Sequence, residues 1–359
     1  MCGIVGLFDT REQRAVDVDV LGRMNAVQFH RGPDEGGQHT EPGVGLGHRR
    51  LSIIDLATGQ QPLWNEDHSV VVVFNGEIYN YRSLIPRLEA AGHVFRTRSD
   101  TEVIVHAWEE WGEACVREFN GMFAFCLWDR NQRTLFLARD RFGEKPLYWT
   151  IGEDGWFAFA SELKSLVVRP GQARRLDSAA VEDYLAFGYV PEPRTIYAGV
   201  HKLPPAHTMT LQMGGTPRLR EYWQPSFAPN GVRTLEAAVP ELQERFREAV
   251  KLRLVSEVPL GAFLSGGVDS SAVVASMAGL QEGPVETCSI SFGDPRFNES
   301  TYADAIAKRF GTNHHVEQVD SDDFDLVDTL VRAYDEPFAD SSALPTYRVC
   351  QLARKHVTV

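Results

Sequence analysis

The pattern of apolar and polar residues divides the chain into two parts. In about the first 210 residues, short apolar runs at 70–74, 122–128, 134–138 and 156–160 indicate β-strands. Two segments between these runs predict helices. Residues 81–91 end at Gly92, which suits a left-handed cap, and residues 100–111 open with the carboxylate of Asp100, which suits a helix amino end.

From residue 235 onward, helical and strand patterns alternate. Apolar residues at three- and four-residue spacing over 235–254 predict a helix with one buried stripe. The later pattern predicts strands at 259–264, 286–292 and 315–319 and helices at 270–277, 300–310, 322–334 and one ending near Lys355. This alternation predicts a parallel sheet covered by helices on both faces, and the final triplet 357–359 looks like the start of another strand.

Residues 212–234 are polar and rich in glycine and proline, which is typical of a connection between domains. We therefore expect a first domain over 1–210, a linker over 211–234 and a second domain over 235–359. A chain of 359 residues with 43% hydrophobic residues is long enough for two cores.

Charge and cysteine usage narrow the function classes. A net charge of −13 repels phosphodiester backbones and anionic membranes, so we expect neither nucleic acid nor membrane as a partner. No run approaches the ~18 apolar residues of a membrane helix. The five cysteines are odd in number and contain no Cys-x-x-Cys pair, which favours reduced thiols in a cytoplasmic protein. They are Cys2, Cys115, Cys126, Cys288 and Cys350.

Cys2 is the first candidate for chemistry. Removal of Met1 would leave a thiol and an α-amine on one residue, so the nucleophile would carry its own base. An α-amino group titrates near ~7.7–8.0, which allows proton exchange with the thiol near neutral pH. The alternative is that Cys2 is simply an apolar residue of an edge strand.

Several segments downstream of Cys2 favour the chemical interpretation. Together they resemble the class II glutamine amidotransferase domain, over roughly residues 1–210. The resemblance implies an N-terminal-nucleophile fold, an αββα sandwich with two stacked sheets between helical layers. The matching segments are Cys2-Gly3-Ile4-Val5-Gly6, His30-Arg31-Gly32-Pro33-Asp34, His48-Arg49-Arg50-Leu51-Ser52, Phe74-Asn75-Gly76-Glu77-Ile78-Tyr79-Asn80 and Ser99-Asp100.

The same resemblance gives these residues tasks in binding glutamine. Arg50 would clamp the substrate α-carboxylate, and Asp100 would pair with the substrate ammonium. The Asn75 amide and the Gly76 N–H would face the oxyanion formed when the thiolate attacks, with Glu77 also at the glutamine site. Each has a simpler alternative: Asn-Gly is a common hairpin turn, Arg50 a surface cation and Asp100 a helix cap.

A second candidate site follows the predicted strand 259–264. The segment Leu264-Ser265-Gly266-Gly267-Val268-Asp269-Ser270-Ser271 places glycines and hydroxyls where a helix begins, so backbone N–H groups would point at an anion. It resembles the ATP-pyrophosphatase loop. The resemblance implies ATP as cofactor, attack at its α-phosphate, and magnesium held by Asp269. The alternative is a Gly-rich turn with an Asp-Ser helix cap.

Phe292 ends the next predicted strand and by position resembles the family residue that lines the adenine pocket, beside Leu264. Ends of adjacent parallel strands bind ligands in such folds, although core packing explains both apolar residues nearly as well. The expected fold class is thus α/β multi-domain: the αββα sandwich followed by a partial adenine-nucleotide α-hydrolase-like parallel α/β domain.

Both halves together resemble the glutamine-hydrolysing asparagine synthetases. The resemblance implies glutamine, ATP and a carboxylate acceptor, aspartate by default, and it allows a homodimer. Members of that family continue beyond this length with a second Ser-Gly motif and a catalytic lysine. We therefore expect a C-terminally truncated chain whose glutaminase works while its synthetase half is incomplete.

Other interpretations stay open at this point. The acceptor could be another carboxylate, for example in polysaccharide biosynthesis, or the chain could be a glutaminase only. A glutaminase that feeds a sugar-phosphate isomerase or a phosphoribosyl transferase shares the first half but lacks the loop at 265–271. A tRNA-modifying enzyme would favour a basic face, and a non-catalytic binding module would not need Cys2.

Overall fold

The computed structural model describes residues 1–229, 231, 234–296, 298–319 and 324–359. Two compact units are present: Met1–Ser226 together with Asp335–Phe338, and Phe227–Tyr334 together with Ala339–Val359. Within the predicted connection 211–234, residues 230, 232 and 233 lie outside the described part, as do residues 322 and 323 of the predicted helix 322–334. Among the described helices, none is long and apolar enough to cross a membrane.

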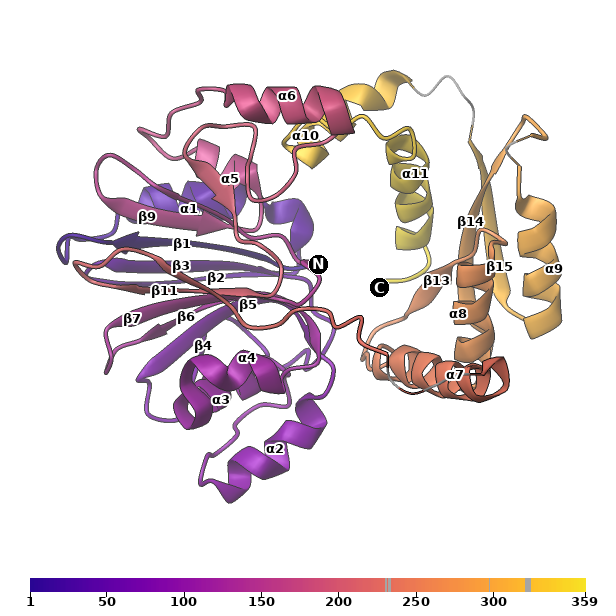
Figure 1. Ribbon diagram of the computed structural model, residues 1–359, viewed down its shortest axis with the longest axis horizontal. Helices are drawn as coiled ribbons and strands as arrows, with labels where there is room; N and C mark the ends of the chain where they lie inside the picture. Colours follow the sequence, from indigo (N-terminus) through magenta and orange to yellow (C-terminus); the bar gives the residue numbers. More distant parts are fainter. Residues whose placement is uncertain (230, 232–233, 297, 320–323) are drawn as a thin grey trace. The chain divides into compact units, whose positions relative to one another are not determined.

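The first unit contains two six-stranded antiparallel sheets (Figure 1). The first sheet runs in the order β10 (Val200–Lys202), β8 (Tyr148–Ile151), β9 (Trp156–Ala160), β1 (Gly3–Asp9), β3 (Val44–Arg50) and β2 (Glu35–Glu41). The second runs in the order β12 (Arg218–Glu221), β11 (His207–Gln212), β7 (Thr134–Arg139), β6 (Gly121–Asp129), β5 (Val70–Ile78) and β4 (Leu63–Trp64).

Apolar residues that alternate along these strands join the two sheets face to face. Ile4 and Phe8 of β1, for example, share one buried core with Val71 and Val73 of β5. The other face of the first sheet packs on α1 (Val18–Ala26), α5 (Leu163–Val167) and α6 (Ser178–Phe187). The second sheet is flanked by α2 (Tyr81–Ala90), α3 (Glu102–Trp111) and α4 (Cys115–Glu118) (Figure 1). This arrangement confirms the predicted αββα sandwich.

The predicted strands and helices of this half are confirmed, and two short 3-10 helices join them, at Phe29–Arg31 and Gly112–Ala114. One element differs from expectation. Strand β12 lies inside the segment expected to be a connection, and it pairs with β11 at the sheet edge. All four of its residues are exposed. An exposed edge strand needs no apolar alternation, so its sequence resembles a loop.

The second unit is a parallel three-stranded sheet in the order β13 (Gly261–Phe263), β14 (Glu286–Phe292), β15 (Asn313–Val319). Helices α8 (Val268–Ala278) and α9 (Ser300–Phe310) pack together with β13 in one buried cluster. Helix α7 (Leu235–Leu252) adds Val250 to a second cluster. Helix α11 (Ala343–Arg354) lies on the other side of the strands (Figure 1), which confirms helices on both faces.

Near its end, the described chain has a short 3-10 turn, Phe324–Leu326, followed by α10 (Val327–Tyr334). Residues 357–359 run beside β13 without being assigned as a strand, and the Gly261 N–H donates to the Val359 carbonyl at 2.9 Å.

Candidate functional site

Cys2 lies directly before β1, where the first sheet brings it beside the end of β3. The two strands are antiparallel with Gly3 opposite Arg49, so Arg50 and Leu51 flank the cysteine. The half-buried Cys2 Sγ donates to the Leu51 carbonyl at 3.7 Å. Burial raises the pKa of the Cys2 thiol in spite of opposing effects of the amino terminus and Leu51. The thiol is therefore protonated near neutral pH and needs a base.

One edge of β5 presents backbone donors toward the same region. The Phe74 N–H donates to Gln61 Oε1 at 2.7 Å, and the Ile78 N–H donates to Asp100 Oδ2 at 2.8 Å. N–H groups alternate along a strand, so the Gly76 N–H faces the same edge, between these two side-chain acceptors. A backbone donor in this position is suited to an incoming oxyanion.

Asn75 and Gly76 lie within β5, opposite Ala124 and Phe123 of β6. The hairpin-turn alternative is therefore wrong. Asn75 is buried, and neither its amide nitrogen nor its amide oxygen has a hydrogen-bond partner among the described residues. A buried amide without partners is costly, which indicates a place for a ligand. Gly76 is required by packing, because a Cβ there would lie 2.1 Å from the Met122 carbonyl oxygen.

Asp100 is buried just before α3, yet it does not cap that helix. The N-cap position belongs to Thr101 without a side-chain bond, while Asp100 bonds Ile78. Burial, with the nearby charge of Glu77, raises the pKa of Asp100 to about 7. Arg50 and Asp100 both act electrostatically on the Cys2 thiol, so the structure brings all three together.

Arg50 is buried rather than a surface cation. Its Nη1 binds Glu35 at 2.9 Å, and its Nη2 donates to the carbonyls of Ile54 and Asp55 at 3.2 and 2.6 Å. These bonds use three of the five N–H donors of a guanidinium and fix its plane. A bound carboxylate would therefore share this group with Glu35.

Two charged groups were not predicted as site residues, one near the thiol and one linked to Cys2 through Arg31. Lys145 is buried, and its pKa is lowered mainly by burial, with Glu77, Arg31 and Cys2 among its charged neighbours. Glu162 accepts from Arg31 Nη1 at 3.1 Å. Both residues reach the site from segments more than a hundred positions away, and no local pattern marks them.

The acidic segment after α10 supplies two carboxylates to the first unit. Lys164 Nζ pairs with Asp335 Oδ1 at 3.1 Å, and Lys202 Nζ pairs with Glu336 Oε2 at 2.8 Å. The Ile196 N–H also donates to Glu336 at 2.7 Å. Both carboxylates are thus engaged by lysines of the first unit.

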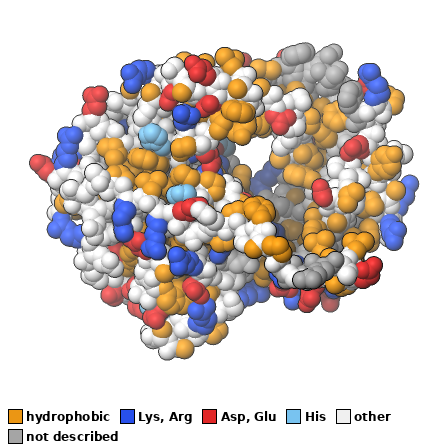
Figure 2. All heavy atoms as spheres, in the orientation of Figure 1, with side chains coloured by type: hydrophobic (Ala, Val, Ile, Leu, Met, Phe, Trp, Pro, Cys, Tyr) orange, Lys and Arg blue, Asp and Glu red, His pale blue; other side chains and the backbone are white. Residues whose placement is uncertain are grey.

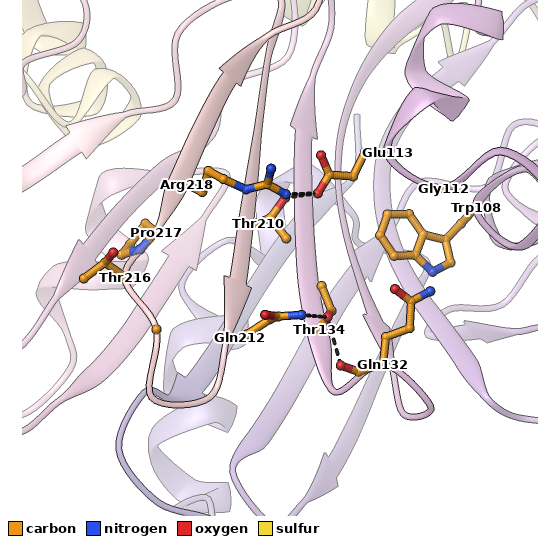
Figure 3. A pocket seen from close by; sticks show the side chains of 11 residues that line it. Trp108, Gly112, Glu113, Gln132, Thr134, Thr210, Gln212, Thr216, Pro217 and Arg218 are labelled. Carbon is orange, nitrogen blue, oxygen red and sulfur yellow. Dashed lines mark hydrogen bonds and ion pairs between the residues drawn. The ribbon is translucent and has the colours of Figure 1, made fainter.

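A polar pocket of about 670 Å³ opens on the second sheet, away from the predicted residues. Figure 3 shows Thr210 and Arg218 directed at Glu113, and Gln212 bonded to Thr134. No residue predicted for the glutamine site lines it. Figure 2 shows acidic and basic side chains interspersed over the face in view, so neither sign dominates there.

In the second unit, residues 264–267 connect β13 to the amino end of α8. Gly266 has a φ of +83°, and a Cβ there would lie 2.6 Å from the Tyr302 Cβ. The N-cap residue of α8 is Gly267, which makes no side-chain cap bond. The first turn of α8 therefore presents backbone N–H groups to an anion, and Asp269 lies in that turn. The Ser265 and Ser270 hydroxyls hydrogen-bond each other at 3.1 Å.

A cavity of about 320 Å³ lies beside this loop, and Leu264, Ser265 and Phe292 all line it. Its wall also includes Ile290, Thr346 and Val349, so α11 completes it. Such a pocket, largely apolar with the hydroxyls of Ser265, Ser289 and Thr346 in its lining, is suited to a planar base attached to phosphates.

Family comparisons agree with this architecture. A model described as "Glutamine amidotransferase domain" matches residues 1–223, and one described as "Asparagine synthase" matches residues 241–359. The first unit is therefore a glutamine amidotransferase domain. Because both models match in this order, and because the relatives below share the whole chain, the protein belongs to the glutamine-hydrolysing asparagine synthetase family.

Asparagine synthetase [glutamine-hydrolyzing] 1 of Bacillus subtilis is 39% identical over 100% of this chain and 57% of its own length. Putative asparagine synthetase [glutamine-hydrolyzing] 2 of Methanocaldococcus jannaschii is 36% identical over 100% of this chain and 73% of its own length. The chain thus spans about half to three quarters of these relatives. Among solved structures, the glutamine phosphoribosylpyrophosphate amidotransferase of B. subtilis aligns with 88% of this chain and with 81% of its own chain. Its sequence identity to this chain is 14%, and the TM-score is 0.46.

Proposed function

We propose that this chain hydrolyses glutamine to glutamate and ammonia at Cys2. The observation that carries the proposal is the buried Asn75 amide, which has no partner among the described residues. Asn75 is followed in β5 by Gly76, whose N–H lies on the strand edge where the Ile78 N–H binds Asp100. A nucleophile, two oxyanion donors and a carboxylate for an ammonium are the groups that amide hydrolysis of an amino acid requires.

The chemistry follows from the protonation states. With Met1 removed, the Cys2 α-amine takes the thiol proton, and the thiolate sulfur bonds to the carboxamide carbon of glutamine. The Asn75 amide and the Gly76 N–H stabilise the oxyanion. The ammonium then protonates the departing nitrogen, which leaves as ammonia, and water hydrolyses the remaining thioester to glutamate. The raised pKa of the thiol makes this paired base necessary.

Substrate selection rests on the two ends of the amino acid. Asp100 pairs with the ammonium of glutamine, and Arg50 donates its two remaining N–H groups to the α-carboxylate. Glu77, which influences the pKa of Asp100, completes the acidic side of this site. Binding of these two groups places the side-chain carboxamide of glutamine next to the Cys2 sulfur.

The experiment is covalent trapping with 6-diazo-5-oxo-L-norleucine, an electrophile that mimics glutamine. We expect one label per chain on the amino-terminal peptide, with Met1 absent by mass spectrometry, and glutamate release that Cys2→Ser abolishes. Cys350→Ser is the matched control, since Cys350 is an exposed thiol on α11. Retained Met1, or glutaminase activity that survives Cys2→Ser, would contradict the proposal.

For the second half, we propose that residues 235–359 form an ATP-binding domain that follows the glutaminase domain, with β12 of the segment 211–234 still part of the second sheet of the first unit. The pyrophosphate would lie against the loop from Ser265 to Ser270 and the amino end of α8, with the adenine in the cavity bordered by Phe292. Asp269 in the first turn of α8 would hold magnesium, which would neutralise charge on the phosphates. The reaction supported best is ATP-dependent amidation of aspartate by the ammonia released at Cys2.

Aspartate-dependent exchange of labelled pyrophosphate into ATP tests this second half. Exchange with aspartate but not with glutamate or succinate supports the assignment. Exchange with a different carboxylate indicates another acceptor, and glutamine hydrolysis without ATP binding indicates a glutaminase only.

A further inference from the structure

Four side chains of the first unit converge at a place that the glutamine chemistry does not use. Glu66 follows β4, His93 follows α2, and His106 and Glu109 lie one turn apart on α3. One potential ligand atom from each lies within 4.8 Å of all the others. The set is two imidazoles and two carboxylates drawn from three separate segments.

The shorter separations between these side chains approach those of ligands around a common centre. His106 Nδ1 lies 3.3 Å from Glu66 Oε2 and 3.6 Å from Glu109 Oε2. His93 Nδ1 lies 3.8 Å from Glu109 Oε2 and 3.9 Å from Glu66 Oε1. Bonds of ~2.0–2.1 Å to a tetrahedral metal would place its ligands ~3.3–3.4 Å apart, close to the shorter of these distances.

His106 supplies an independent sign that something is bound. Its side chain is fully buried, and neither ring nitrogen has a hydrogen-bond partner among the described residues. Glu66 Oε2 is likewise buried without a partner. Direct ion-paired hydrogen bonds would be ~2.7–2.9 Å long, and none of the contacts between these histidines and carboxylates is that short.

The surroundings fit a metal centre as well. Asn65 Nδ2 donates to Glu109 Oε1 at 2.8 Å and orients that carboxylate. His106 Nε2 faces Glu102 Oε1 at 3.6 Å, and Glu102 is itself held by the N–H groups of Arg96 and Thr97 at 2.8 and 2.7 Å. A carboxylate behind the second nitrogen of a histidine is typical of metal ligation.

We propose that Glu66, His93, His106 and Glu109 bind one structural divalent transition-metal ion, zinc by its ligand preference. Two imidazoles and two carboxylates match zinc, and four protein ligands leave no open position for catalysis. The ion ties the turn before β5 and the segment after α2 to α3. Its role is to stabilise the helix that follows Asp100.

A proton is the alternative occupant. Burial lowers the pKa of His106, but Glu102, Glu109 and Glu66 together raise it to about 9, so without a metal the ring would be an imidazolium. The experiment therefore has to distinguish a bound metal from a protonated ring.

The chain is expressed without a polyhistidine tag, and its metal content is measured by mass spectrometry after gel filtration. We expect about one zinc per chain. Cobalt added to chelator-treated protein should give the visible absorption of a tetrahedral site, and zinc should raise the unfolding midpoint. Glu109→Gln and His93→Gln, which each remove one ligand and leave the fully buried His106 in place, should lower metal affinity about tenfold or more while the circular dichroism stays unchanged.

Matched controls are Glu118→Gln and His39→Gln, which remove a half-buried carboxylate paired with Arg87 and a histidine paired with Glu41. Both should retain zinc. The proposal is overturned if zinc, cobalt, nickel, manganese and iron all fail to bind stoichiometrically. It is equally overturned if Glu109→Gln and His93→Gln bind zinc as tightly as the controls, which would indicate adventitious surface binding.

Discussion

The Arg31 side chain donates a hydrogen bond from Nε to the backbone carbonyl of Cys2 at 2.8 Å. The same guanidinium binds Glu162 through Nη1, and Lys164 binds the other oxygen of Glu162 at 2.9 Å. Burial opposes ionisation, yet His30, Lys164 and Arg31 lower the pKa of Glu162 to about 2. Glu162 is therefore ionised at neutral pH, and the network holds the backbone of the nucleophile without touching its sulfur.

We therefore predict that Arg31 is a positioning residue for the proposed glutaminase. Arg31→Gln should lower kcat for glutamine hydrolysis about 10- to 100-fold, because a small displacement of Cys2 misaligns attack, while KM changes little. Steady-state kinetics measure the two separately. Arg23→Gln on the exposed face of α1 is the control and should behave as the parent. A rise in KM at constant kcat would show instead that Arg31 binds substrate.

Asp100 should make stability depend on pH. Its pKa rises from ~3.9 in the unfolded chain to about 7 in the folded protein, so the folded state binds more protons between these values. The contribution of Asp100 to the free energy of unfolding is therefore greatest below pH 4, and it declines as the pH rises to 7. Asp100→Asn removes that loss, so we expect it to raise the unfolding midpoint at pH 8 and to change it little at pH 4.5. Equal effects at both pH values would be inconsistent with this pKa.

The same group should control glutamine affinity. Only the ionised carboxylate attracts the substrate ammonium, so the KM of the parent should rise as pH falls below 7. Asp100→Asn should have a high KM that no longer varies over this range. Kinetics between pH 6 and 8.5 test this, and a pH-dependent KM retained in Asp100→Asn would assign the titration to another group.

Local patterns predicted the architecture because most strands have one buried face, which gives their sequences a recognisable apolar pattern. Local patterns alone are misleading where long-range pairing overrides local preference. Asn75-Gly76 favours a hairpin turn by composition, yet β6 pairs with both residues and keeps them extended. Strand β12 was missed for the opposite reason, since an exposed edge strand carries no apolar signal.

The site was predicted only as far as its residues lie in recognisable segments. Lys145 is a charged neighbour of Cys2, and Glu162 acts on it through Arg31, but both lie in distant loops and nothing in their own neighbourhoods marks them. The metal-binding cluster was invisible for the same reason. His93 and His106 are thirteen positions apart, far from the Cys-x-x-Cys or adjacent-histidine spacings that sequence inspection favours.

Gly76 should be intolerant of a side chain. Gly76→Ala would place a Cβ 2.1 Å from the Met122 carbonyl and 2.7 Å from the Phe123 Cα, so β5 and β6 must separate. We expect a lower unfolding midpoint and loss of glutaminase activity. Gly22→Ala is the control, because its nearest atom is 3.7 Å away and alanine in a helix stabilises by ~0.5–1 kcal/mol. If both variants unfold at the same temperature, the close contact does not constrain β5.

Gly266 should be equally restrictive for nucleotide binding. Gly266→Ala forces a non-glycine residue to a φ of +83° and places its Cβ 2.6 Å from the Tyr302 Cβ on α9, so the loop must shift away from α9 and its backbone N–H groups are displaced. We expect ATP binding, measured by titration with a fluorescent analogue, to weaken at least about tenfold. Glutamine hydrolysis by the first unit should persist. Gly279→Ala at the other end of α8 is the matched control, since its nearest atoms lie 3.7 Å away. If both variants bind ATP with the same affinity, the loop does not form the proposed phosphate site.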